Sequence, residues 1–176
     1  ASDVYKRQLI YFEQSGALNE SLSDVFGSLV KQYQRQQTAD KADWLIGEGL
    51  LAKGIHGKGL RSMSQPGSAY DDPILGKDPQ PAHMKDFVHT QQDNGGVHIN
   101  SGIPNHAFYL AARAIGGFAW QKAGHAWYDA VCDNSLAKDA DFSTFARLTV
   151  RHGEKRFGKE IADAITQAWG RVGVVL

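Results

Sequence analysis

Two carboxylates, Glu20 and Asp24, stand four residues apart in a stretch whose apolar spacing predicts a helix. Side chains four residues apart lie one turn above each other, so the pair shares a helix face. A solvated acidic face is one interpretation. Because Leu22 and Phe26 crowd the pair, the other is a face that meets a cation, either a metal ion or a histidine held by one.

A second candidate group is His98, which follows a pair of glycines and lies five residues after Asp93. The glycines permit backbone angles that other residues avoid, so the chain can turn Asp93 back toward the imidazole. A neighbouring carboxylate favours the protonated form of that ring. Taken alone, the pair is either a surface ion pair or a positioned catalytic donor.

Three stretches together resemble one family, the thermolysin-like neutral zinc metallopeptidases. They are Gly16-Ala-Leu-Asn-Glu-Ser-Leu-Ser-Asp24, Leu60-Arg-Ser-Met-Ser64 and Asp93-Asn-Gly-Gly-Val-His-Ile-Asn-Ser-Gly102, in the order in which that family carries them. The resemblance runs from about Leu9 to Leu176. It implies the C-terminal helical domain of a metalloendopeptidase that uses zinc, acts on peptide or protein substrates and is secreted.

The resemblance also implies a role for each candidate residue. The glutamate that matches Glu20 binds zinc, and the aspartate that matches Asp24 hydrogen-bonds one of the zinc histidines. The histidine that matches His98 donates to the tetrahedral oxyanion, and the aspartate that matches Asp93 orients it. The arginine that matches Arg61 binds a peptide carbonyl beside the scissile bond, for which a planar fork of donors is suited.

An apolar pocket for a bulky hydrophobic substrate side chain is implied as well. Leu60 matches one of its walls, and Ile46 and Leu50 would complete it. The other interpretation of these three residues is ordinary hydrophobic core.

Calcium is where the chain departs from the family. Members that bind paired calcium ions use an acidic cluster after the zinc-ligand helix. Asp43 and Glu48 match acidic positions of that cluster, whereas Lys31 and Leu45 stand where carboxylates would be. An ammonium group repels a divalent cation, so we expect no paired calcium site and leave a single weak site open.

Helices are the elements that must position these residues. Apolar residues at three- and four-residue intervals predict helices in five segments: Gly16 to about Arg35, Ile103–Ile115, Trp120–Val131, Phe142–Thr149 and Ile161–Trp169. Pro104 fits a first turn, Gly116-Gly117 a stop and Asp141 an N-cap. No convincing alternating strand appears. The predicted fold is therefore mainly α, an orthogonal bundle of about five helices with long irregular loops.

The composition excludes several classes of protein. The 176 residues suffice for one domain with its own core. Nineteen basic and nineteen acidic side chains cancel, and no basic tract indicates a nucleic acid or an anionic membrane as partner. No apolar run approaches 18 residues, so we expect no membrane span. The single cysteine, Cys132, excludes an internal disulfide framework and is expected in the core.

The first eight residues do not fit what precedes Glu13-Gln-Ser-Gly16 in the family. We interpret residues 1–8 as a non-native scar and residues 9–176 as the C-terminal helical domain. None of the seven histidines is followed by Glu, so the chain has no His-Glu-x-x-His motif. We therefore expect a polypeptide truncated upstream of Leu9, inactive on its own, whose partner is the missing N-terminal half.

The alternative is a non-catalytic binding or structural module that kept the helical scaffold and lost the zinc motif. The retained set of site residues argues against it: Glu20, Asp24, Arg61, Asp93 and His98. An upstream reading frame that encodes His-Glu-x-x-His would favour the enzyme, and a start codon near Leu9 would favour the module.

Overall fold

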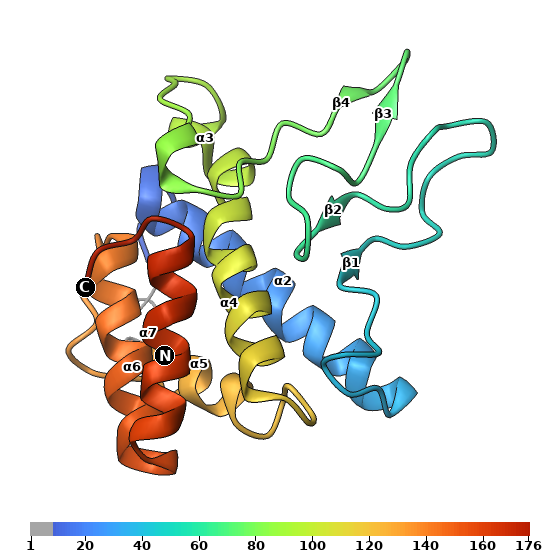
Figure 1. Ribbon diagram of the computed structural model, residues 1–176. Helices are drawn as coiled ribbons and strands as arrows, with labels where there is room; N and C mark the ends of the chain where they lie inside the picture. The colour runs from blue at the N-terminus through green and yellow to red at the C-terminus, as the bar shows by residue number, and fades with distance from the viewer. Residues whose placement is uncertain (1–8) are drawn as a thin grey trace, which may run out of the picture.

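The computed structural model describes residues 9–176 and confirms a mainly α fold (Figure 1). The elements in chain order are α2 (Glu13–Arg35), β1 (Leu45–Ile46), β2 (Arg61–Ser62), β3 (Asp71–Asp72), β4 (Gly76–Lys77), the 3-10 helix η1 (Met84–Asp86), α3 (Asp93–Asn100), α4 (Gly102–Ile115), α5 (Ala123–Val131), α6 (Phe142–Phe157) and α7 (Lys159–Arg171). In Figure 1 the helices pack against one another, and the two β-hairpins extend from one side of them. The expected scar, residues 1–8, lies outside the described residues and stays a prediction.

Helix α2 runs along the bundle and carries both candidate carboxylates. It begins at Glu13, three residues before the predicted start, behind Phe12 in an extended conformation. Phe12 makes no side-chain cap, so the sequence gives no capping signal at this end. Ser15 lies in the first turn and donates to the carbonyls of Ile10 and Phe12.

The core lies between α4, α5, α6 and α7. Its largest fully buried side chains are aromatic: Trp127, Trp169, Phe108, Phe142 and Phe145. The rings of Trp127 and Trp169 stack with their centroids 5.8 Å apart. Aromatic residues bury the most apolar surface per side chain, so this cluster dominates the stability of the bundle.

Three helix-end signals predicted in the second half of the chain are confirmed, whereas α6 runs to Phe157, beyond the predicted end at Thr149. Pro104 lies in the first turn of α4, and Gly116 ends that helix with a φ of +72°. The carboxylate of Asp141 accepts from the backbone N–H of Thr144 at 2.7 Å, as an N-cap does. Trp120 precedes α5, which starts only at Ala123.

The sequence analysis did not predict the two short antiparallel strand pairs. β1 pairs with β2 in antiparallel register, with Ile46 opposite Arg61, and β3 pairs with β4. Each strand has two residues, too short for an alternating pattern. The first hairpin places a candidate pocket residue beside the candidate substrate-binding arginine.

One further expectation, on the cysteine, is contradicted by the structure. Cys132 is exposed, so its assignment to the core was wrong; it lies just past the end of α5, at the residue that caps the helix. Within residues 9–176, none of the helices combines the length and apolar character that crossing a bilayer demands.

Candidate active site

A left-handed turn opens α3 and precedes His98, which lies in the last turn of that helix. Asp93, Asn94, Gly95 and Gly96 have φ values of +53°, +51°, +80° and +79°. Only glycine, asparagine and aspartate adopt this conformation readily, which is why the sequence reads Asp-Asn-Gly-Gly here. The turn brings the Asp93 carboxylate over the helix that follows.

The Asp93 carboxylate holds His98 at two points. One oxygen accepts from the backbone N–H of His98 at 2.9 Å, and the other lies 2.5 Å from its Nδ1. A carboxylate only accepts, so Nδ1 carries a proton and donates. The ring is thereby fixed with Nε2 facing away from Asp93.

Beyond Nε2 lies the carboxylate of Glu20. The hydroxyl of Tyr11 donates to one Glu20 oxygen and lies 3.0 Å from Nε2 of His98. Nε2 itself is 3.5 Å from the other Glu20 oxygen. Partial burial, the hydrogen bond to Glu20 and the nearby charges of Glu20 and Asp93 raise the pKa of Tyr11 to about 12. The carboxylate therefore faces two groups that can donate hydrogen bonds.

Sequence reasoning missed Tyr11. It lies in the short segment before α2, and 87 residues separate it from His98. The segment shows no periodic pattern, and a tyrosine beside Ile10 and Phe12 looks like part of an apolar stretch. Only the folded chain shows that its hydroxyl meets the two predicted site residues.

One turn along α2, Asp24 meets Arg61 rather than solvent. Nε and Nη2 of Arg61 donate to the two oxygens of Asp24, each at 2.7 Å. The hydrogen bond to Asp24 raises the pKa of Arg61. The buried side chain of Asn105, which the sequence did not single out, donates to the same carboxylate at 2.9 Å. Asp24 thus orients the guanidinium, whose opposite edge stays directed away from the ion pair.

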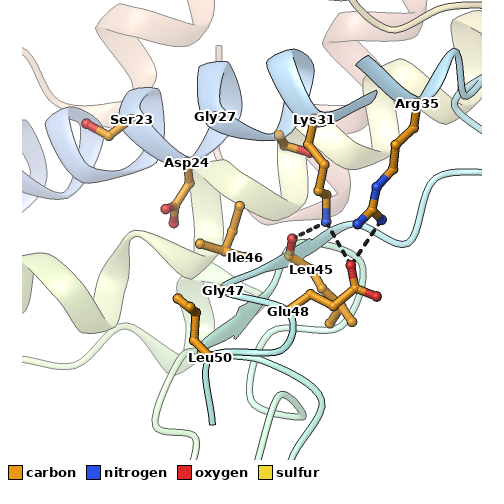
Figure 2. A pocket seen from close by; sticks show the side chains of 11 residues that line it. Ser23, Asp24, Gly27, Lys31, Arg35, Leu45, Ile46, Gly47, Glu48 and Leu50 are labelled. Atoms are coloured by element: carbon orange, nitrogen blue, oxygen red, sulfur yellow. Dashed lines mark hydrogen bonds and ion pairs between the residues drawn. The ribbon is translucent and has the colours of Figure 1, made fainter. Parts of the chain in front are cut away.

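The predicted pocket residues lie near this ion pair. Ile46 and Leu50 line a pocket of about 360 Å³ together with Asp24 and Gly27 of α2 (Figure 2). Leu60 lies beside it and packs over Gly47, where an added Cβ would meet its side chain at 2.6 Å. Leu50 is 71% exposed and Leu60 41% exposed, so neither is ordinary core.

A zinc centre needs three or four ligands, which sets a test for this site. Among residues 9–176, no three histidine, cysteine, aspartate or glutamate side chains are placed to hold a metal ion together. The carboxylate of Glu20, whose side chain is 22% exposed, fits one metal ligand and is flanked by Tyr11 and His98. The remaining ligands would have to come from outside the described residues.

The fold and the site together define a class: a mainly helical domain in which one long helix brings a carboxylate next to an imidazole and a tyrosine hydroxyl and orients an arginine near an apolar pocket. The chain belongs to the thermolysin metallopeptidase family, because the sequence model of that family's alpha-helical domain matches residues 7–174.

Individual relatives agree with this membership. The chain is 66% identical over 166 residues to an extracellular metalloprotease of Pectobacterium carotovorum subsp. carotovorum, covering 94% of this chain and 48% of the relative. It is 62% identical to the extracellular minor metalloprotease of Serratia marcescens, covering 96% and 47%. The solved precursor of protealysin, a metalloproteinase from Serratia proteamaculans, superposes with a TM-score of 0.94 at 72% identity, covering 95% and 52%. The chain spans about half the length of these relatives.

Proposed function

We propose that this chain is the helical half of a zinc endopeptidase that cleaves peptide bonds next to bulky hydrophobic residues. The observation that carries the proposal is the convergence of Tyr11, His98 and Glu20 at one point of the surface. Zinc bound at Glu20 would supply Lewis-acid polarisation of a peptide carbonyl and an activated water.

His98 and Tyr11 are the donors to the oxyanion. Asp93 holds Nδ1 and turns the opposite nitrogen, Nε2, toward Glu20, and the imidazolium form of the ring carries a donor there. The hydroxyl of Tyr11 lies 3.0 Å from that nitrogen, so both groups reach the same small region. Donors fixed in advance need no reorganisation as charge develops, and one such donor lowers a barrier by roughly 3 kcal/mol.

Arg61 binds a substrate carbonyl, and Asp24 positions it. The bidentate pair uses one edge of the guanidinium, which directs the opposite edge outward. Because a carboxylate has about four acceptor sites, Asp24 also keeps capacity to hold an imidazole of the metal centre. Ile46, Leu50 and Leu60 receive the bulky side chain of the substrate.

The other half of the enzyme supplies the remaining metal ligands and the general base. The roughly half-length coverage of the relatives supports this division. On its own the chain is inactive and binds zinc weakly at best. The enzyme acts outside the cell on peptides or proteins, which is supported by its similarity to extracellular metalloproteases.

The experiment is a complementation. Residues 9–176 are fused to the preceding half of the Pectobacterium relative, and casein hydrolysis is measured with and without a chelator. We expect hydrolysis by the fusion, its loss with chelator and no hydrolysis by the chain alone. Zinc-dependent hydrolysis by the chain alone would overturn the division of the site, and an inactive, folded fusion would favour the non-catalytic module.

A further inference from the structure

The C-terminal half of α2 carries a cation that the proposed reaction does not use. Nζ of Lys31 donates to Oδ1 of Asp43 at 2.5 Å and to the carbonyl oxygen of Leu45 at 2.7 Å. An oxygen of Glu48 lies 4.0 Å from it. Figure 2 shows the side chain of Lys31 reaching from the helix toward Leu45 and Glu48.

The surroundings of Lys31 are organised around its charge. Partial burial opposes ionisation of Asp43, yet the hydrogen bonds from Lys31 and from the backbone N–H of Leu45 lower its pKa. Arg35, one turn further along the helix, donates to Asp43 at 3.1 Å and to Glu48 at 3.0 Å. The side chain of Arg35 is 47% exposed and that of Lys31 22%, so Lys31 is the inner member of the cluster.

The oxygens around Lys31 all belong to the loop that forms one wall of the pocket. Residues 43–48 include β1, and the side chains of Ile46 within this loop and of Leu50 just after it line the pocket. Trp44 anchors the start of the loop in the core, and beyond it the loop is held by a two-residue strand pair, which has little stability of its own. The charge-assisted contact with Lys31 therefore contributes to where residues 45–48 lie on α2.

We propose that Lys31 is a positioning residue. Its ammonium is an internal cation that fixes residues 43–50 on α2 and thereby sets the position of Ile46 and Leu50 in the pocket. Lysine suits this task because a compact point charge can gather oxygens from several directions. The consequence for substrate rests on the proposed function, whereas the position of the loop is measurable without any activity.

The test is amide hydrogen exchange on the full chain. The backbone N–H groups of Leu45, Leu60 and Met63 report on the loop, since they bond to Asp43, Ile46 and Trp44 respectively. Lys31→Met removes the charge but keeps much of the stem. We expect these three amides to exchange about tenfold to a hundredfold faster, because a charge-assisted hydrogen bond has been lost.

Two variants serve as controls. Lys41→Met removes the same charge from a side chain that is 77% exposed and 3.8 Å from its nearest carboxylate, so it should leave the three amides unchanged. Lys31→Arg keeps a cation within reach and should restore most of the protection. Unchanged exchange in Lys31→Met, or equal acceleration in the buried helices α6 and α7, would overturn the inference.

Asp43→Asn gives a second route to the same question, should Lys31→Met fail to fold. It removes the partner charge at a half-buried position and should speed exchange of the same amides. In the active fusion, Lys31→Met should raise KM for bulky substrates about tenfold and leave kcat within about twofold. An unchanged KM would overturn the role of Lys31 in the pocket, while an inactive parent fusion would overturn the proposed function instead.

Discussion

The two halves of helix α2 treat carboxylates in opposite ways. Near its start, Glu20 faces the hydroxyl of Tyr11 and the imidazole of His98, whose side chain is 52% exposed. Near its end, the loop carboxylates form ion pairs with Lys31 and Arg35. Fixed cations complete a structural site, whereas adjustable donors leave a carboxylate able to bind something else. We therefore expect the first half of α2 to take part in the reaction and the second half to hold the loop in place.

Removing the carboxylate at the adjustable end should have the largest effect. Glu20→Gln in the active fusion keeps size and shape but lowers the ability to bind a metal ion. We expect hydrolysis to disappear and bound zinc to fall, as measured by casein cleavage and metal analysis of the dialysed protein. Full activity in this variant would remove the chemical side of the comparison. Glu48→Gln is the matched control, because Glu48 lies in the loop beside the other end of α2 and pairs with Arg35. This variant should retain zinc.

Removing a donor should cost less than removing the ligand. His98→Ala should lower kcat of the fusion by about a hundredfold to a thousandfold, as for other preorganised oxyanion donors. KM and the melting temperature should change little, because the ring is half exposed. His125→Ala, in helix α5, tests whether loss of any histidine has this effect. Similar losses in the two variants would contradict the assignment.

A substitution in the left-handed turn should show how much the contact between this turn and the start of α2 contributes to stability. A Cβ at residue 95 would lie 2.6 Å from Cγ of Glu13, in a residue with a φ of +80°. Gly95→Ala should therefore lower the free energy of unfolding by about 2–3 kcal/mol, measured with urea. Gly116→Ala has a φ of +72° but open space around its Cβ, so it should show the backbone strain alone. Equal losses would mean that the contact with Glu13 is unimportant.

Replacing Lys31 by a carboxylate should give the second half of α2 a site that can bind a metal ion. Lys31→Glu places a third carboxylate near Asp43 and Glu48, a set of oxygens that calcium prefers. Millimolar calcium should raise the melting temperature of this variant by about 5 °C and leave the parent chain unchanged. A parent chain that calcium stabilises equally would contradict the expectation that it has no paired calcium site.

Acid should weaken the fixed end selectively, with the smallest effect. The pKa of Asp43 is lowered from 3.8, so its contribution to stability is present above pH 3.8 and is lost as the pH falls through its lower folded-state value. Urea midpoints between pH 6 and pH 3 should fall less steeply in Lys31→Met than in the parent. Parallel curves would indicate that other carboxylates, such as Asp133, account for the acid sensitivity.

The sequence predicted the helices well because their signals are local. The apolar spacing and the caps at Asp141 and Gly116 lie within each helix, and the structure bears them out. The early start of α2 was missed because Phe12 offers no capping side chain. The two-residue strands were missed because they are too short to show a period.

Glu20, Asp24, Arg61 and His98 stand in recognisable motifs, and their roles stay predictions. The expected contact between Asp93 and His98 is present, whereas the pairing of Asp24 with Arg61 was not foreseen. Asn105 reaches Asp24 across 81 residues, from within the apolar stripe of α4. Nothing local marks such a residue, because its partner is chosen by helix packing. Tyr11 was missed for the same reason, because its contact with His98 joins residues 87 positions apart in the sequence.

The contact between the left-handed turn and the start of α2 has a consequence for how this family can vary. The turn that carries His98 rests on Glu13, and Tyr11 lies two residues before it. The two donors therefore share one foundation, and their spacing is set by backbone rather than by side-chain choice. Insertions or deletions should be tolerated in the exposed loop around residues 51–55 but not in either of these two segments, where a change in length would pull the donors apart.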